Sequence, residues 1–267
     1  MAIIAALGAM LFCAPVYAAD RSDFQGSLSS LESADASLTR VVREAAPRIK
    51  AAVAKKAARS ADIGLSFDED VPEATRRQMA NDLAFVESIK GSGASPLLRK
   101  IFGAVDGPSY RRFFSSRVRS VGMSAPAPAE MLAAVDPEKA PGQMLLNRSY
   151  VDSEMPEIQR VAIMFHEARH LEDERDHWAH AVCPGVLTDL DGRRWDTNLG
   201  GKRGCDTTPI GGYGLSLVML RNIERYCENC SGKAILDAGL FADTISTRIA
   251  DDDARQALRD DFSTFSR

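Results

Sequence analysis

The segment from Ile158 to His170 contains the pattern His166-Glu167-Ala-Arg-His170, which constrains the fold more than any other stretch of the chain. Residues four apart on an α-helix lie one above the other, so a helix here would turn two imidazoles toward one ion. Apolar residues recur beside them at helical spacing: Ile158, Val161, Ala162, Phe165 and Ala168. The sequence therefore predicts a helix with one buried face and one face that carries both histidines.

The histidines are confined to one short part of the chain. All four, His166, His170, His177 and His180, fall between residues 166 and 180. Histidines with ordinary surface or core roles would be scattered, so this clustering argues against a chance match in a core helix. Glu167 follows the first histidine, where its carboxylate can take a proton from a water on a bound metal. We predict a metal site in which His166 and His170 are ligands and Glu167 is the catalytic base.

This pattern resembles the active-site helix of the zincin metallopeptidases. Together with His180-Ala-Val-Cys183 and with Cys205-Asp206 ahead of Gly-Gly-Tyr213-Gly, it is also similar to a group of poorly characterised exported bacterial proteins. The resemblance covers residues 141–230. It implies a mainly helical α+β fold with an active-site helix, a small upstream sheet and C-terminal helices, and it implies Zn²⁺ as the cofactor.

The resemblance also implies roles for residues outside the helix. Tyr213 would stabilise the oxyanion that develops during peptide hydrolysis, and a structural tyrosine at a helix start is the alternative explanation. A strand predicted at 143–151 would lie antiparallel to bound substrate and offer it a backbone edge. We therefore expect an exported zinc-dependent peptidase that acts on peptides or proteins. The alternative is a non-catalytic, zincin-like zinc-binding or scaffolding protein of the cell envelope.

The third metal ligand has several candidates, because a catalytic zinc takes three protein ligands and leaves one position for water. His180 is the first choice, since imidazole is a strong zinc ligand. Asp206 is the second, by similarity to the aspzincins. Asp176 and Glu224 follow, by similarity to a metzincin variant and to the gluzincins. His177 would lie ~10 Å beyond the second histidine on a continuous helix, which is too far to share its ion.

The N-terminus and the cysteines together predict export. Residues 1–18 have the character of a signal peptide, with an apolar run followed by Val16-Tyr17-Ala18 and a predicted cleavage after Ala18. An even number of cysteines remains, which in an exported chain indicates disulfides. We favour Cys183–Cys205 and Cys227–Cys230. The other two pairings and a four-cysteine zinc site are the alternatives.

The rest of the chain contains no further motif, but its composition excludes some classes of protein. A formal net charge of -4 argues against a nucleic-acid-binding protein, because no basic excess exists to meet phosphates. After the leader, no apolar segment reaches the length of a transmembrane helix. Residues 19–100 have helical periodicity without a chemical motif, and residues 101–267 carry every candidate site residue. We therefore expect a helical N-terminal region followed by a zincin-like catalytic region in a periplasmic or extracellular protein.

Overall fold

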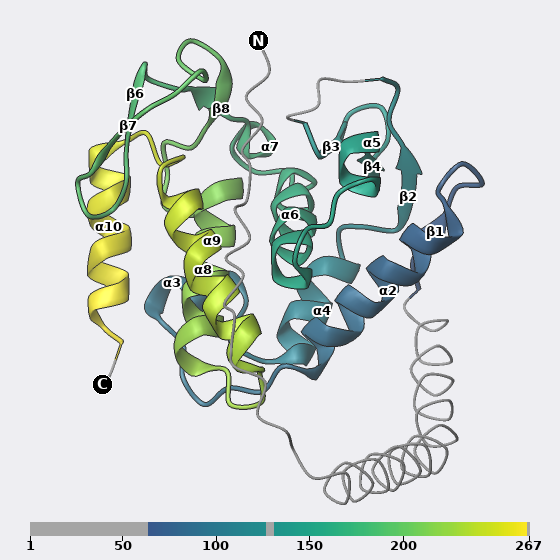
Figure 1. The fold of residues 1–267 in the computed structure, drawn as a ribbon, viewed down its shortest axis with the longest axis horizontal. Helices are drawn as coiled ribbons and strands as arrows, with labels where there is room; N and C mark the ends of the chain where they lie inside the picture. The colour runs from purple at the N-terminus through teal and green to yellow at the C-terminus, as the bar shows by residue number, and fades with distance from the viewer. Residues whose placement is uncertain (1–63, 127–130, 266–267) are drawn as a thin grey trace, which may run out of the picture. The chain divides into compact units, whose positions relative to one another are not determined.

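The computed structural model describes residues 64–126 and 131–265. The predicted signal peptide, its cleavage site and residues 19–63 of the predicted N-terminal region lie outside the described residues. Every described residue belongs to one compact unit, Lys55–Arg267. The sequence-based boundary at residue 100 lies inside this unit, whose elements Figure 1 labels.

The described residues form an α+β fold in which helices predominate, as the sequence predicts. Its main sheet has four short strands in the order β1-β2-β4-β3. Their bounds are β1 Ser66–Phe67, β2 Ser120–Met123, β3 Ala133–Val135 and β4 Gln143–Leu146. β1, β2 and β4 run parallel, and β3 pairs antiparallel with β4, which brings Ala134 opposite Leu145.

One prediction about this sheet is wrong. The strand expected at 143–151 ends at Leu146, because Asn147 caps a short helix, α5 (Arg148–Val151), by accepting a hydrogen bond from the amide of Arg148. Moreover, β4 pairs with β2 on one side and β3 on the other, so it has no free backbone edge. Among the described strands, β3 is the edge strand next to β4.

Helix α6 (Glu157–His170) is central to the packing, in contact with β3 and with four other helices (Figure 1). Three of them are α2 (Glu73–Ser88), α8 (Gly212–Tyr226) and α9 (Gly232–Ser246), and the fourth is the short α7 (Arg175–Trp178) that follows it in the chain. All five apolar positions predicted for its buried face are buried. The ring of Phe165 packs against the aromatic rings of Phe102, Tyr110, Phe113 and Phe114, with centroids 5.6 to 6.0 Å away. This packing determines which face of α6 remains for the histidines.

The remaining helices surround this centre. They are α3 (Pro96–Ile101), α4 (Gly107–Ser115), the four-residue turn α7 (Arg175–Trp178) and α10 (Asp252–Ser263). In α3 and α4 the caps follow from sequence, since Ser95 and Asp106 each accept a hydrogen bond from the amide three residues on, and a proline opens each first turn. Within residues 64–126 and 131–265, no helix is both long and apolar enough to cross a membrane.

Between α7 and α8 the chain forms two small antiparallel pairs. Strand β5 (Ala181–Val182) pairs with β8 (Arg203–Cys205), and β6 (Val186–Thr188) pairs with β7 (Arg194–Asp196). A Cys183–Cys205 disulfide joins the first pair, and a Cys227–Cys230 disulfide follows α8. Both disulfides favoured from the sequence are therefore confirmed.

Candidate metal centre

The C-terminal half of α6 places His166 and His170 one turn apart, and the helix ends at His170. The chain then reverses through a left-handed turn, since Asp176, His177 and Trp178 have φ values of 54°, 52° and 56°. Non-glycine residues in this region cost about 1–2 kcal/mol each, so other contacts must hold the turn. Because the chain reverses here, His180 lies back against the histidines of α6.

Three imidazole nitrogens converge at this point. The Nε2 atom of His166 lies 3.1 Å from that of His180 and 3.2 Å from that of His170, and the third pair is also 3.2 Å apart. A tetrahedral zinc with Zn–N bonds of 2.0–2.1 Å holds neighbouring nitrogens about 3.3 Å apart. Within the described residues, this is the one group of histidine, cysteine or acidic side chains with the geometry to hold a metal ion.

The opposite nitrogen determines the tautomer of two of these rings. Nδ1 of His170 is 2.9 Å from the carbonyl oxygen of His177, and Nδ1 of His180 is 3.0 Å from Oδ1 of Asp206. The backbone of Gly212 lies close to the His166 ring, whose Nε2 faces the other two rings. Because carbonyl and carboxylate oxygens only accept, Nδ1 carries the hydrogen in His170 and His180. The Nε2 lone pairs of these two rings therefore point toward Nε2 of His166, an arrangement that a bound cation would stabilise.

Burial favours the neutral form of His166 and His170. The pKa of His166 is held well below its ordinary value, first by burial and then by the nearby rings of His170 and His180. The pKa of His170 is lowered by burial and by His180. Neutral imidazoles are the form that binds a metal, so the site is prepared for one at neutral pH.

The structure places Asp206 behind the group rather than in it. One carboxylate oxygen accepts the hydrogen bond from His180, and the other accepts one from the amide of Gly214 at 3.0 Å. Asp206 is 4% exposed, so this charge is stabilised by those two donors and not by water. A carboxylate in this position orients a histidine ligand and raises its basicity.

The other two ligand candidates lie elsewhere. Asp176 is an exposed residue of the left-handed turn. Glu224, in the last turns of α8, pairs with Arg221 at 2.8 Å and packs against Gly239 of α9. Neither belongs to the convergent group, whereas His180, the first choice from sequence, does. His177 contributes its backbone carbonyl to His170 rather than its ring.

Close approach of α8 to the histidines requires the two glycines that begin it. A Cβ atom on Gly212 would lie 2.8 Å from Cε1 of His166 and 3.0 Å from Nε2 of His170. A Cβ atom on Gly211 would lie 2.5 Å from the carboxylate of Asp206. The Gly-Gly pair is visible in the sequence, but its role becomes apparent only when α8 is placed against α6.

Tyr213 packs directly on two of the three converging imidazole rings. Its ring stacks on that of His180 at 4.9 Å and meets that of His166 edge-on at 4.4 Å. Burial raises the pKa of its phenol, while the positive charge of Arg248 opposes that rise. The phenol oxygen forms no hydrogen bond with another described residue, so it remains available to a ligand.

Glu167 is buried beside the histidines at 8% exposure. Its carboxylate forms no ion pair or hydrogen bond with any described residue. Burial alone raises its pKa to about 8. Burial disfavours the charged form of this carboxyl group, and a nearby cation would favour it.

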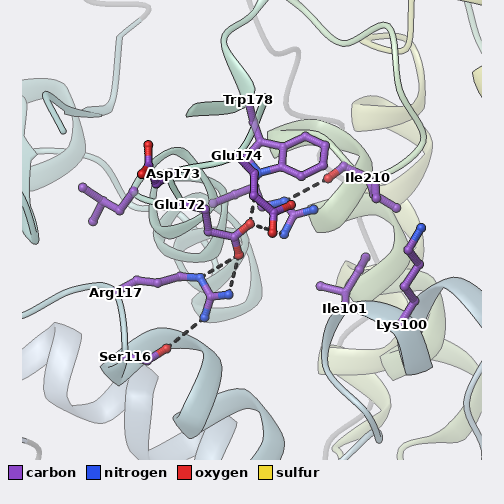
Figure 2. A pocket seen from close by; sticks show the side chains of 11 residues that line it. Lys100, Ile101, Ser116, Arg117, Glu172, Asp173, Glu174, Trp178 and Ile210 are labelled. Carbon is purple, nitrogen blue, oxygen red and sulfur yellow. Dashed lines mark hydrogen bonds and ion pairs between the residues drawn. The ribbon is translucent and has the colours of Figure 1, made fainter. Parts of the chain in front are cut away.

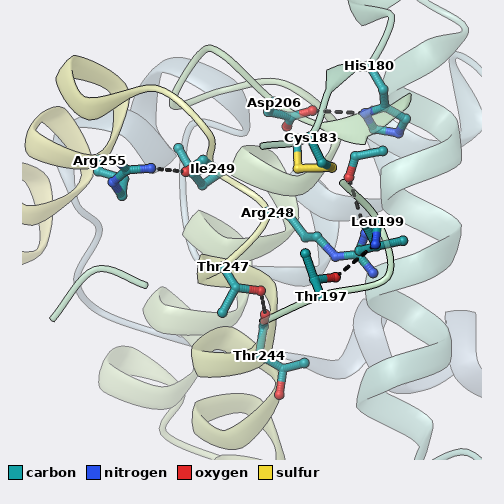
Figure 3. The surroundings of a disulfide bond; sticks show 12 residues. His180, Cys183, Thr197, Leu199, Asp206, Thr244, Thr247, Arg248, Ile249 and Arg255 are labelled. Carbon is teal, nitrogen blue, oxygen red and sulfur yellow. Dashed lines mark hydrogen bonds and ion pairs between the residues drawn. A yellow bond between two sulfur atoms is a disulfide. The ribbon is translucent and has the colours of Figure 1, made fainter. Parts of the chain in front are cut away.

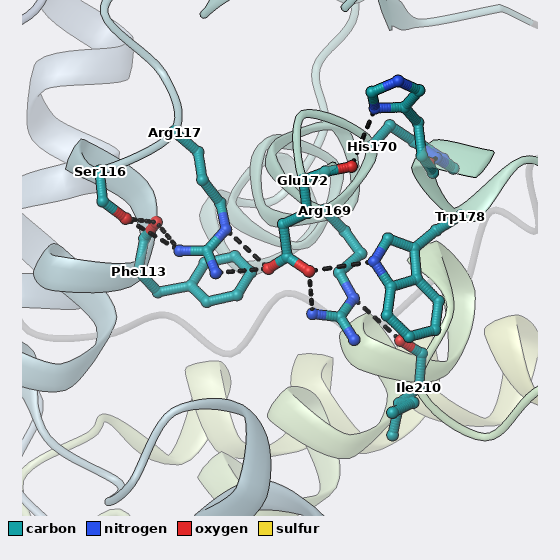
Figure 4. A network of polar contacts seen from close by, with 9 residues as sticks. Phe113, Ser116, Arg117, Arg169, His170, Glu172, Trp178 and Ile210 are labelled. Carbon is teal, nitrogen blue, oxygen red and sulfur yellow. Dashed lines mark hydrogen bonds and ion pairs between the residues drawn. The ribbon is translucent and has the colours of Figure 1, made fainter. Parts of the chain in front are cut away.

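A polar network holds the turn that supplies His177 and His180 (Figure 4). Glu172 binds Arg117 through one oxygen, and through the other it binds Arg169 at 2.5 Å and the indole nitrogen of Trp178 at 3.0 Å. Arg169 lies over the Trp178 ring at 3.8 Å and donates to the carbonyl of Ile210. These contacts offset the cost of the left-handed turn, and nothing in the sequence motif identifies them.

A cavity of about 700 Å³ borders the same network (Figure 2). The residues that line it include Lys100, Arg117, Arg169, Glu172, Trp178 and Ile210. None of the three converging histidines lines it, so this hollow is separate from the metal centre.

Comparison of the chain with protein-family models, with curated proteins and with solved structures found no match.

Proposed function

We propose that this chain is an exported zinc-dependent metallopeptidase that hydrolyses peptide bonds. The observation that carries the proposal is the convergence of three imidazole Nε2 atoms, together with the buried side chain of Glu167, which follows His166 on α6. The resemblance of residues 141–230 to the zincins supports it, since in that family a helix with this pattern holds the zinc and the base.

Zinc is the metal that suits the ligand set. His166, His170 and His180 would hold it through Nε2, and three histidines leave one coordination position open. Imidazole also binds copper, iron and nickel, but near-tetrahedral spacing of neutral nitrogens favours zinc. A zinc in such a site lowers the pKa of a bound water and polarises a carbonyl.

Glu167 is the residue available for proton transfer. It follows His166 on α6, has no competing partner among the described residues, and lies in a site with little access to water. As a carboxylate it takes a proton from the attacking water, and it returns that proton to the leaving amine. Tyr213 contributes a phenol donor beside His166 and His180 for the developing oxyanion.

Strand β3 is the element on which a peptide substrate would pair. In the zincins the substrate lies antiparallel to an edge strand, and β4 is excluded from this role because both of its edges are occupied. β3 is an edge strand, runs antiparallel to the rest of the sheet, and contacts α6. Backbone pairing there would bring the scissile bond toward the histidines.

Two disulfides are compatible with an exported protein, because thiols in an oxidising compartment pair and persist as disulfides. Together with the signal-like leader, they support action in the periplasm or outside the cell.

The decisive experiment compares wild type with Glu167→Gln in zinc content and in cleavage of a peptide library or casein. The amide keeps the shape of the carboxylate but cannot accept a proton at neutral pH, so we expect full zinc and a loss of hydrolysis by several orders of magnitude. Glu224→Gln is the matched control and keeps both, because Glu224 lies outside the group. Wild type with stoichiometric zinc and no cleavage of any peptide would favour the non-catalytic zinc-binding alternative.

A further inference from the structure

Arg248 lies beside the candidate metal centre, and within the described part of the chain no carboxylate forms an ion pair with it. It follows α9, in the turn between that helix and α10, and its guanidinium carbon is 5.4 Å from the centroid of the Tyr213 ring. That ring in turn packs on His180 and His166. Figure 3 shows Arg248 and His180 around the same disulfide, Cys183–Cys205.

The guanidinium keeps most of its donors free. Its one hydrogen bond runs from Nη1 to the carbonyl of Gly204 at 3.3 Å, and among the described residues no carboxylate pairs with it. Two other arginines in this part of the chain pair with carboxylates, Arg221 with Glu224 and Asp243, and Arg255 with Asp252. A half-buried guanidinium of this kind has four further N–H groups for an acceptor.

The backbone of Arg248 is tied to the residue that orients His180. The amide of Asp206 donates to the carbonyl of Arg248 at 2.8 Å, and the amide of Ala250 donates to the carbonyl of Asp206, also at 2.8 Å. Asp206 holds His180 through its side chain at the same time. Arg248 is therefore connected rigidly to the third imidazole, although the two residues are far apart in sequence.

We infer that Arg248 is a specificity-determining residue that binds a carboxylate group of the substrate. This inference rests on the proposed function, because it places an anionic group next to the bond to be cleaved. Guanidinium and carboxylate form paired, charge-assisted hydrogen bonds, which are stronger than neutral ones. The carboxylate can be the C-terminus of a peptide or an acidic side chain, and both present the same group.

The test measures binding, so that it does not depend on turnover. The zinc-loaded Glu167→Gln protein is titrated by calorimetry with four N-acetylated peptides of otherwise identical sequence. They end in a free carboxylate or an amide, and they carry Glu or Gln at one internal position. We expect at least one of the two carboxylates to tighten binding by about tenfold or more. The terminal and the side-chain comparisons identify which one Arg248 takes.

Substitution at Arg248 then assigns the effect. In the Glu167→Gln protein, adding Arg248→Met should remove the preference for a carboxylate, so that the carboxylate peptide binds only as tightly as the matching amide peptide. Zinc content and melting temperature should remain unchanged. Arg248→Lys keeps the charge without the planar fork and should restore part of the preference. The control Arg194→Met removes one positive charge from exposed β7 and should leave the preference intact.

The outcomes separate the two proposals. Equal binding of acid and amide in both comparisons overturns the role of Arg248, as does a preference that survives Arg248→Met. Failure of every peptide to bind at millimolar concentration overturns it as well. A carboxylate preference that depends on Arg248, in a wild-type protein that cleaves nothing, would instead retain the binding role and refute the peptidase.

Discussion

The carboxylate of Asp206 bridges the third imidazole and the start of α8, since Oδ1 accepts from His180 and Oδ2 accepts from the amide of Gly214. One buried residue therefore couples the position of His180 to the helix that packs against the other two histidines. The sequence made Asp206 the second candidate for the third ligand, whereas the structure places its carboxylate behind His180, where it would orient that ring toward a metal.

We predict that Asp206→Asn weakens zinc affinity by roughly 10- to 100-fold, whereas His180→Ala abolishes stoichiometric binding. His180 and Gly214 donate to different oxygens of Asp206, and asparagine replaces one of these oxygens with an NH2 donor, so one of the two hydrogen bonds is lost. Competition with a chromophoric chelator measures both affinities. Asp176→Asn is the control, since asparagine tolerates the left-handed conformation of that exposed position. Wild-type affinity in His180→Ala would show that the third ligand lies elsewhere.

Gly212→Ala should eliminate metal binding while the protein remains folded. Its methyl group would lie 2.8 Å from the ring of His166, so either α8 or the imidazole must move. Zinc content after gel filtration, together with circular dichroism, measures the two effects separately. Gly232→Ala, at the start of α9, is the control because nothing lies within 4 Å of the added atom. A Gly212→Ala protein with full zinc would contradict this account of the close approach.

The Glu172 network should be required for stability and for the metal site together. Glu172→Gln leaves the guanidinium groups of Arg117 and Arg169 without their carboxylate, which at a site this buried costs about 3–5 kcal/mol. Since the same residue binds Trp178 in the left-handed turn, zinc affinity should fall as well. Denaturant unfolding and a chelator assay measure the two losses. Glu174→Gln, at an exposed neighbouring position, should change neither.

The two disulfides should contribute unequally. Cysteines 183 and 205 are 22 residues apart and cysteines 227 and 230 are 3 apart, so the chain-entropy model assigns about 3 kcal/mol to the first and about half of that to the second. Paired Cys→Ser variants compared by denaturant unfolding test this order. Intact mass of periplasmic protein should correspond to a chain that begins at Ala19 with no free thiol. Four free thiols in that material would refute both the pairing and the export that it supports.

Local rules are sufficient for the part of the site that lies on α6. Helical spacing alone places His166 and His170 one turn apart, and the apolar residues of the other face determine which side is buried. The observed helix, Glu157–His170, contains the whole segment 158–170 that periodicity marks as helical. Its end at His170 was not determined by the sequence, because no glycine or proline follows before Pro184. The cysteine pairing was also accessible, since the cysteine count and spacing restrict the alternatives.

Tertiary structure decided the rest. His180 reaches the other histidines through three consecutive non-glycine residues in a left-handed conformation, which no local propensity favours and which Glu172 stabilises from outside the motif. Strand β4, which precedes α6, lies inside the sheet because β3 pairs with its second edge. The alternation of side chains along a strand does not predict which other strand will pair with it. Arg248 and Asp206 meet through backbone pairing across more than forty residues. Sequence determined the ligands on one helix because the α-helix is a local structure; closure of the site depends on contacts that exist only after the chain has packed.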